Sequence, residues 1–246
     1  MSKEVIVADI GGTHIRFARI KNNKIFDFIK KETPKNKNKL LKELVNGIKN
    51  YVNKNTKGIG ISCAGVIENN VVKISPNLPL KNVNLKKYLQ SKFKKRFEIE
   101  NDANCAALAE ARFGIKRKNF LVITLGTGVG GGIIINGELY KGKNGAGEFG
   151  EIILNKGKNF EYHYKKSKNN KKKLASIIGQ GIASLISVLD PEEIVLTGGL
   201  KRSVGTNFLN NIKKEIRKYV MQNRIPKIMW SKIKHPSLIG ASLLFD

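Results

Sequence analysis

Two segments of this chain share one construction: a β-rich run, a glycine turn and a second β-rich run. Val5–Ile20 reads VIVADIGGTHIRFARI, and Phe120–Asn136 reads FLVITLGTGVGGGIIIN. β-Branched and aromatic residues on both sides of a glycine turn are typical of a β-hairpin. The two segments open two halves of comparable length. We therefore predict a duplicated α/β fold in which each half begins with a hairpin.

Helical and strand-like patterns alternate through the rest of the chain. Strands are predicted at 58–65, 97–100 and 193–199, and helices near 39–52, 85–95, 101–113, 174–189, 207–220 and 237–244. Gly114 is a fitting stop for the Ala-rich helix before it. We expect an N-terminal lobe of residues 1–114 and 236–246, a C-terminal lobe of residues 115–235, and a cleft between the two lobes.

The composition is typical of a globular protein, because 41% of the 246 residues are hydrophobic. The sequence has no apolar run near the length of a membrane span and no charged-then-apolar leader, so we expect a soluble, cytoplasmic protein. Cys63 and Cys105 have no CxxC partner and are expected to be reduced core thiols. The three histidines lack metal-ligand spacing, so we expect no structural metal.

The formal net charge of +27 is the strongest compositional signal. Such a charge is typical of proteins that bind nucleic acid or another polyanion. Lysine and asparagine are abundant throughout the chain, however, and no helix-turn-helix, zinc-finger or RNP pattern is present. We therefore attribute the charge to a general bias and expect no nucleic-acid partner. The densest basic run, KKSKNNKKK at 165–173, is interpreted as a solvated loop, or alternatively as a binding surface for a phosphate chain.

The glycine turns are candidate phosphate sites. Glycine lets backbone N–H groups approach an anion that a Cβ atom would keep away, and Thr13 or Thr127 can add a hydroxyl donor. Asp9 precedes the first turn and is a candidate ligand of Mg²⁺ through water, because hard cations prefer carboxylate and water oxygens. The alternative is two ordinary hairpins with an incidental aspartate.

Asp102 is the candidate catalytic base. Phosphoryl transfer to an alcohol requires a group that takes the hydroxyl proton, and a carboxylate within hydrogen-bond reach can do so. Asp102 follows a predicted strand and precedes a predicted helix, a junction that commonly faces a cleft in α/β sheets. Asn101 beside it offers a donor and an acceptor to sugar hydroxyls. The alternative is that Asn101 and Asp102 only cap the helix.

Five segments in order along the chain carry a family resemblance. They are DIGGTHIR (Asp9–Arg16), SPNLP (Ser75–Pro79), ENDANCAALAE (Glu100–Glu110), GTGVGGGIIINGELYKGKNGAGEFGE (Gly126–Glu151) and PEEIVLTGGL (Pro191–Leu200). In these segments the chain resembles the ROK family of repressors, open reading frames and sugar kinases. The resemblance implies a two-lobed actin-like, ribonuclease H-like fold and a homodimer. It implies an ATP- and Mg²⁺-dependent sugar kinase of carbohydrate metabolism that phosphorylates the 6-hydroxyl of a hexose, with glucose as the default acceptor.

The same resemblance assigns roles to particular residues. It makes Asp102 the general base, and it places the donor phosphates at Gly11, Gly12, Thr13, Gly126, Thr127 and Gly128. Gly198 and Gly199 are expected against the nucleoside. Sugar contacts are expected from Asp102, Asn77, Asn101, Glu148, Glu151 and Glu161. The place of Glu161 rests on an alignment through a segment whose sequence differs from that of the family.

The chain departs from the family in its signature region. Glu151 stands where many members have a histidine that helps bind sugar and zinc, and NKGKNFEYHYKKSKNNKKK (155–173) replaces the Cys-rich zinc loop, so we expect no zinc. A short form with a basic loop is similar to the polyphosphate-dependent glucokinases of the family. N-acetylhexosamine kinase, a catalytically silent member and a sugar-responsive nucleic-acid-binding regulator are further alternatives. Against the regulator, the phosphate motif begins at Asp9, so we expect no winged-helix region before it.

Overall fold

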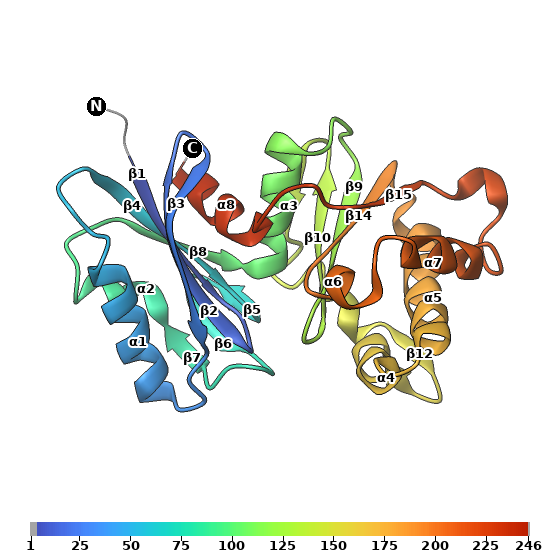
Figure 1. The fold of residues 1–246 in the computed structure, drawn as a ribbon, viewed down its shortest axis with the longest axis horizontal. Helices are drawn as coiled ribbons and strands as arrows, with labels where there is room; N and C mark the ends of the chain where they lie inside the picture. The colour runs from blue at the N-terminus through green and yellow to red at the C-terminus, as the bar shows by residue number, and fades with distance from the viewer. Residues whose placement is uncertain (1–3, 246) are drawn as a thin grey trace. The chain divides into compact units, whose positions relative to one another are not determined.

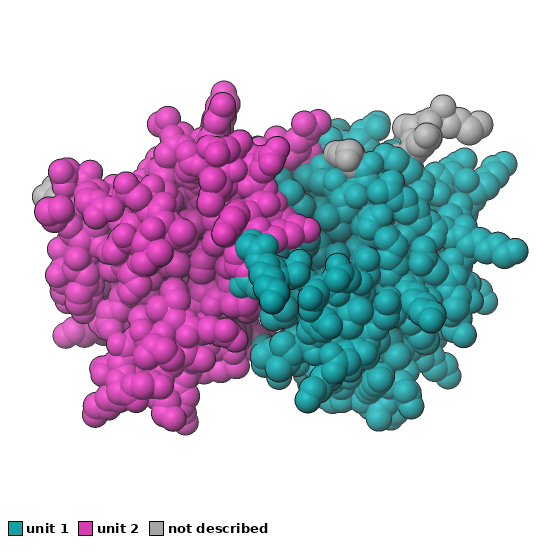
Figure 2. Space-filling view, turned by 180° about the vertical axis from the view of Figure 1, so that it is seen from behind, with its two compact units in different colours: residues 1–109, 142–145, 235–246 teal, residues 110–141, 146–234 magenta. Residues whose placement is uncertain are grey.

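The computed structural model describes residues 4–245, apart from the side chain of Gln222. The chain divides into two compact units, coloured separately in Figure 2. Unit 1 comprises Met1–Ala109, Gly142–Gly145 and His235–Asp246, and unit 2 comprises Glu110–Lys141 and Ala146–Lys234. The first boundary between the units, Ala109/Glu110, falls inside the helix α3 (Asp102–Phe113).

Unit 1 is built on a five-stranded sheet of order β3-β2-β1-β4-β8. Its strands are β1 (Glu4–Ile10), β2 (His14–Lys21), β3 (Lys24–Glu32), β4 (Thr56–Cys63) and β8 (Phe97–Asn101). The first three form an antiparallel meander, and β4 and β8 continue the sheet in parallel with β1. All seven residues of β1 are buried, as expected for a central strand covered on both faces.

Helices cover the sheet of unit 1. α1 (Lys37–Lys49) buries Leu40, Leu44 and Ile48 at helical spacing, and Asn36 caps its first turn. α8 (Pro236–Ser242) contacts β1 and β4. The smaller elements of this unit are β5 (Val66–Glu68), β6 (Val71–Ile74), β7 (Lys81–Asn84), α2 (Leu85–Gln90) and a 3₁₀ turn at Leu243–Phe245.

Unit 2 repeats this sheet, in the order β11-β10-β9-β14-β15. Its strands are β9 (Phe120–Leu125), β10 (Val129–Ile135), β11 (Glu138–Tyr140), β14 (Glu193–Thr197) and β15 (Lys227–Trp230). The strand directions also match, because β9, β10 and β11 form an antiparallel meander and β14 and β15 run parallel to β9. The predicted duplicated α/β fold is thus confirmed at the level of strand order and direction.

Two long helices pack together in unit 2 (Figure 1). They are α5 (Lys171–Leu189) and α7 (Phe208–Ile216). α5 is long and apolar enough in composition to cross a membrane, but most of its apolar residues lie in the core of unit 2, as in the core helix of a globular protein, whereas Val188 is exposed. The other elements are η1 (Phe149–Glu151), β12 (Ile153–Asn155), β13 (Lys158–Asn159), α4 (Phe160–Ser167), α6 (Leu200–Val204) and η2 (Gln222–Arg224).

The basic run at 165–173 is not a loop, and that prediction was wrong. Its first three residues end α4, its last three begin α5, and only 168–170 connect the two helices. Lysine is a good helix former, and Asn159 and Asn170 cap the two helix starts. Buried Phe160 and Tyr164 anchor α4, a pattern that the surrounding lysines obscure in the sequence.

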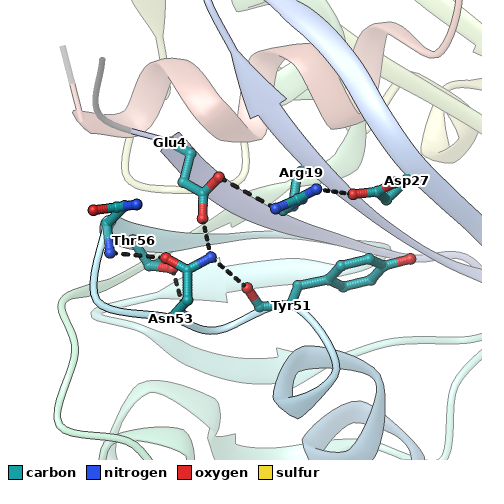
Figure 3. Close-up of polar contacts among 7 residues, drawn as sticks. Glu4, Arg19, Asp27, Tyr51, Asn53 and Thr56 are labelled. Carbon is teal, nitrogen blue, oxygen red and sulfur yellow. Dashed lines mark hydrogen bonds and ion pairs between the residues drawn. The ribbon is translucent and has the colours of Figure 1, made fainter. Parts of the chain in front are cut away.

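Polar contacts join the strands at the end of β1 that lies away from Asp9 (Figure 3). Arg19 on β2 pairs with Glu4 at 3.6 Å and also with Asp27 on β3. Asn53, in the segment between α1 and β4, donates from its side chain to Glu4 and accepts from the N–H of Asn55 at 2.8 Å. These contacts join β1, β2, β3 and the segment before β4 at the end of β1 that holds Glu4.

Both cysteines are buried, and neither forms a disulfide. Burial raises the pKa of the Cys63 thiol, and the negative charges of Asp102 and Asp9 raise it further. Burial also raises the pKa of Cys105, with additional contributions from Glu100, Asp9 and Asp102. These are inert core thiols, and the same contributions indicate that the acidic side chains lie near them.

Candidate functional site

The carboxyl ends of three strands in unit 1 bring the predicted base and the first glycine turn to one edge. In the sheet register Ile10 pairs with Cys63, and Cys63 pairs with Asn101. Gly11 directly follows β1, and Asp102 directly follows β8. These are the two outer strands of the three. Because neighbouring strands lie about 4.8 Å apart, their backbones are separated by roughly 10 Å.

The helix cap is carried by Asn101. Its Oδ1 accepts the N–H groups of Ala103 at 2.8 Å and Asn104 at 3.0 Å, the geometry of an N-cap. Asp102 is the first helical residue, and its Oδ1 also accepts from the N–H of Ala103 at 3.0 Å. Asn101 accepts from two N–H groups of the first turn, and Asp102 shares one of them. Asn101 also donates from Nδ2 to the carbonyl of Gly65 at 2.9 Å.

Asp9 is buried and held on both oxygens. Its Oδ2 pairs with Arg16 at 2.7 Å, and its Oδ1 accepts from the hydroxyl of Ser62 at 2.8 Å. A carboxylate has about four acceptor positions, so these contacts leave positions for a metal-bound water. Among the described residues, no group of three or more His, Cys, Asp or Glu side chains is arranged to hold a metal ion.

The first glycine turn joins β1 to β2 and contacts the predicted sugar loop. The N–H of Gly11 donates to the carbonyl of His14 at 3.0 Å and closes the turn. Thr33 donates from Oγ1 to the carbonyl of Gly11 at 2.6 Å, and Lys35 donates from Nζ to the carbonyl of Gly12 at 2.5 Å. Gly12 is packed against Asn77, so the predicted phosphate and sugar segments touch within unit 1.

The second glycine turn joins β9 to β10 and is held by α4. The N–H of Gly126 donates to the carbonyl of Gly128 at 3.0 Å. The hydroxyl of Tyr164 donates to the carbonyl of Gly126 at 3.1 Å. Lys168 donates to the same carbonyl at 2.9 Å and to that of Thr127 at 3.1 Å.

Gly128 and Gly126 of the second turn differ in the space that is available to a side chain. A Cβ at Gly128 would lie 2.0 Å from Oε2 of Glu161, so a side chain there would displace the carboxylate that accepts the N–H of Val129. A Cβ at Gly126 would meet nothing within 4 Å, and its backbone is not in the left-handed region. Packing therefore does not require glycine at 126, and the space beside its backbone is open, as it is at Gly145 and Gly199.

Three carboxylates gather beside the second turn. Burial raises the pKa of Glu148, and the charges of Glu151 and Glu161 raise it further. Glu161 is fixed, because its Oε2 accepts the N–H of Val129 at 2.9 Å and its Oε1 pairs with Lys165 at 2.6 Å. Glu151, the residue at the position of the family histidine, is exposed on η1.

The predicted nucleoside segment lies next to the second turn. β14 is the parallel neighbour of β9, and Gly198 follows β14 directly. Gly198 has φ +102°, and a Cβ there would lie 2.4 Å from the carbonyl oxygen of Leu125. A Cβ at Gly199 would meet nothing within 4 Å. Gly198 is therefore required by the fold, and Gly199 leaves open space for a ligand.

The predicted site residues fall into two groups. Unit 1 holds Asp9, Gly11, Gly12, Thr13, Asn77, Asn101 and Asp102, and unit 2 holds Gly126, Thr127, Gly128, Glu148, Glu151, Glu161, Gly198 and Gly199. Sequence analysis missed three residues that contact turn carbonyls, namely Thr33, Lys35 and Tyr164, and it named Lys168 only as part of the basic run at 165–173. All four lie more than 20 residues from the turn residues that they contact.

The fold and the paired glycine turns define a duplicated, actin-like α/β protein. The model of the ROK family matches residues 5–163 and 158–246, so the chain belongs to the ROK family. A ROK family glucokinase from Streptomyces griseus, solved in complex with glucose and AMPPNP, is similar to this chain with a TM-score of 0.86 and 25% identity. The match covers 98% of both chains.

Sequence relatives include proteins of different kinds. An uncharacterized protein of Clostridium perfringens (strain 13 / Type A) is 29% identical over 276 residues, which cover 93% of this chain and 92% of that protein. A xylose repressor of Caldicellulosiruptor bescii is 35% identical over 154 residues. That match spans 58% of this chain and 39% of the repressor.

Proposed function

We propose that this ROK protein is a sugar kinase that transfers the γ-phosphoryl group of ATP to the 6-hydroxyl of a hexose, with glucose as the first candidate. The observation that carries the proposal is the position of Asp102. It lies at the sheet edge that holds the first glycine turn, and Asn101 beside it carries the helix cap. The similarity to a glucokinase solved with glucose and an ATP analogue supports the same activity.

The chemistry follows from the roles of these residues. The Asp102 carboxylate accepts the proton of the sugar hydroxyl while the hydroxyl oxygen bonds to the γ-phosphorus and the bond to the ADP oxygen breaks. Backbone N–H groups of the two glycine turns donate to phosphate oxygens. Mg²⁺ neutralises phosphate charge when bound, and Asp9 would hold it through water.

Sugar recognition is assigned to polar groups around Asp102 and to the carboxylates of unit 2. Asn77 and Asn101 offer amide donors and acceptors, whereas Glu148, Glu151 and Glu161 offer hydroxyl acceptors. A buried carboxylate such as Glu148 discriminates strongly, because a sugar that lacks the matching hydroxyl leaves it unsatisfied. We further propose that the protein acts as a homodimer, which light scattering of the purified chain would test.

The test is a coupled assay of a hexose and N-acetylhexosamine panel, with ATP and inorganic polyphosphate as separate donors. Asp102→Asn preserves an acceptor beside Ala103 and removes the base. We expect turnover to fall by about 10²–10⁴-fold while the affinity for the sugar, measured by calorimetry, changes little. We expect the same loss of turnover, with little change in sugar affinity, for Asp102→Ala. Normal turnover in either variant would remove the proposed mechanism.

The second candidate is a sugar-responsive nucleic-acid-binding regulator. The net charge of +27 and the match to a xylose repressor favour it. A gel-shift experiment at physiological salt separates the two candidates. Tight, sequence-specific retention that a sugar releases, together with no turnover on the whole panel, would replace the kinase by the regulator.

A further inference from the structure

The two glycine turns share a set of contacts on their carbonyl sides. Gly11 directly follows β1 and Gly126 directly follows β9, so Gly11 and Gly12 correspond to Gly126 and Thr127 in order along the turns. In both turns a hydroxyl donates to the first carbonyl, from Thr33 in unit 1 and from Tyr164 in unit 2. In both turns a lysine ammonium donates to the second carbonyl, from Lys35 in unit 1 and from Lys168 in unit 2.

These donors come from unrelated elements. Thr33 and Lys35 follow β3, whereas Tyr164 lies on α4 and Lys168 is its C-cap residue. The duplicated strands therefore do not by themselves explain why a hydroxyl and an ammonium group occur twice. A shared requirement of the turns is the simpler explanation.

The contacts fix the direction of the peptide planes. In a trans peptide the C=O and N–H bonds point in opposite directions, and these peptides are trans. In unit 2, Lys168 draws the carbonyls of Gly126 and Thr127 to the α4 side, so the N–H groups of Thr127 and Gly128 point to the other side of the turn. In unit 1, the contacts of Thr33 and Lys35 turn the N–H groups of Gly12 and Thr13 away in the same manner.

We propose that Lys168 and Lys35 are positioning residues of the two donor-phosphate turns, each holding the carbonyls of its own turn to one side so that consecutive backbone N–H groups of that turn are directed at phosphate oxygens. An ammonium on the carbonyl also polarises the peptide and makes its N–H a stronger donor. The proposal rests on the proposed kinase function, because that function supplies the phosphate chain.

Lys168 is the better-defined of the two. Its Nζ lies 5.0 Å from the ring centroid of Tyr164, which is fully buried and therefore a rigid support. Glu161, Tyr164 and Lys168 are spaced three and four residues apart, which places them on one face of α4. From this face Glu161 accepts the N–H of Val129, and Tyr164 and Lys168 donate to the turn carbonyls. Partial burial lowers the pKa of Lys168, and the neighbouring charge of Lys165 lowers it further.

The test compares Lys168→Met, Lys35→Met and Lys168→Arg with Lys166→Met, which removes one charge from an exposed position on the same helix. Calorimetry on the full chain measures the binding of inorganic tripolyphosphate and of ADP, so that a nucleotide and an inorganic phosphate chain are distinguished. We expect Lys168→Met to weaken tripolyphosphate binding at least 10-fold, Lys35→Met to weaken it several-fold, and Lys166→Met less than 2-fold. Lys168→Arg should restore most of the affinity.

Two further readouts separate positioning from a general loss of structure. In ¹⁵N NMR spectra, tripolyphosphate should shift the amide signals of Thr127 and Gly128 in the wild type and not in Lys168→Met. In kinetics, the KM for the donor should rise while the KM for the sugar stays within 2-fold. If Lys168→Met binds tripolyphosphate as tightly as Lys166→Met does, the inference about Lys168 is overturned and the kinase proposal is not affected. A wild-type chain that binds neither tripolyphosphate nor ADP would overturn the kinase proposal as well.

Discussion

A Cβ atom placed on Gly12 would lie 2.6 Å from the Cβ of Asn77, so the first phosphate turn and the sugar loop pack directly against each other in unit 1. Real Cβ atoms do not approach so closely, and both atoms belong to short, inflexible groups. The position of Asn77 therefore depends on the absence of a side chain at residue 12. The contact ties the expected places of the donor phosphate and the acceptor sugar to one fixed distance.

Replacing Gly12 by alanine should therefore damage both substrate sites at once. The added methyl group displaces Asn77, and a misplacement of about 1 Å can cost roughly 10²-fold in rate. We expect kcat/KM for the sugar to fall by about that factor and the KM for the donor to rise. Asn77→Gly in the Gly12→Ala background relieves the clash, so partial recovery of donor affinity is the diagnostic result. An unchanged KM for both substrates would contradict this contact.

Gly126→Ala tests whether a ligand, and not the fold, requires glycine in the second turn. Because its Cβ would meet nothing within 4 Å, we expect the melting temperature to change little. Donor affinity should fall about 10-fold, since the methyl group occupies the space proposed for phosphate. Gly145→Ala is the matched control, because its Cβ also meets nothing within 4 Å. Equal donor affinity in the two variants would refute the assignment.

Glu148→Gln should stabilise the protein while it weakens sugar binding. The folded pKa of Glu148 is raised above the unfolded value of about 4.3, so folding takes up a proton between the two values and stability falls as the pH rises through that interval. Glutamine removes this cost. We expect the melting temperature at pH 7 to rise by about 2–4 °C, the shift that roughly 1 kcal/mol gives in a chain of this size.

The stabilisation by Glu148→Gln should vanish below about pH 4, where the carboxyl group is protonated in both the folded and the unfolded state. The sugar KM should rise about 10-fold, because a charged acceptor is lost. Glu138→Gln, at an exposed position of the same unit, serves as the control and should change neither quantity. A lower melting temperature for Glu148→Gln at pH 7 would show that the carboxylate is satisfied by contacts within the fold.

Asp9→Asn should raise the Mg²⁺ concentration needed for half-maximal turnover. The amide retains an acceptor for Ser62 but loses the charge that favours the metal and the ion pair with Arg16. We expect an increase of about 10-fold in that concentration, with the sugar KM unchanged. Arg16→Gln removes the same ion pair and keeps the carboxylate. If Arg16→Gln shifts the Mg²⁺ dependence as much as Asp9→Asn does, the ion pair is responsible and the metal role of Asp9 is excluded.

The sequence predicted the repeated hairpins because glycine between β-rich runs leaves few other structures, and it predicted the strand-to-helix junction at Asp102. It did not predict which of Asn101 and Asp102 caps α3, since either side chain suits that position and only the coordinates show Oδ1 of Asn101 on two N–H groups. It also misjudged 165–173, where lysines on the exposed faces conceal the anchors Phe160 and Tyr164. The contacts of Lys35 and Lys168 depend on tertiary packing, which no local pattern encodes.

The two buried thiols have a practical consequence for measuring motion between the units. Because Cys63 and Cys105 are enclosed and their pKa values are raised, maleimide and methanethiosulfonate reagents should leave the native chain unmodified. Surface cysteines introduced one in each unit can then carry spin labels or fluorophores in the wild-type background. The distance between the labels, recorded with and without sugar, would report whether sugar binding changes it.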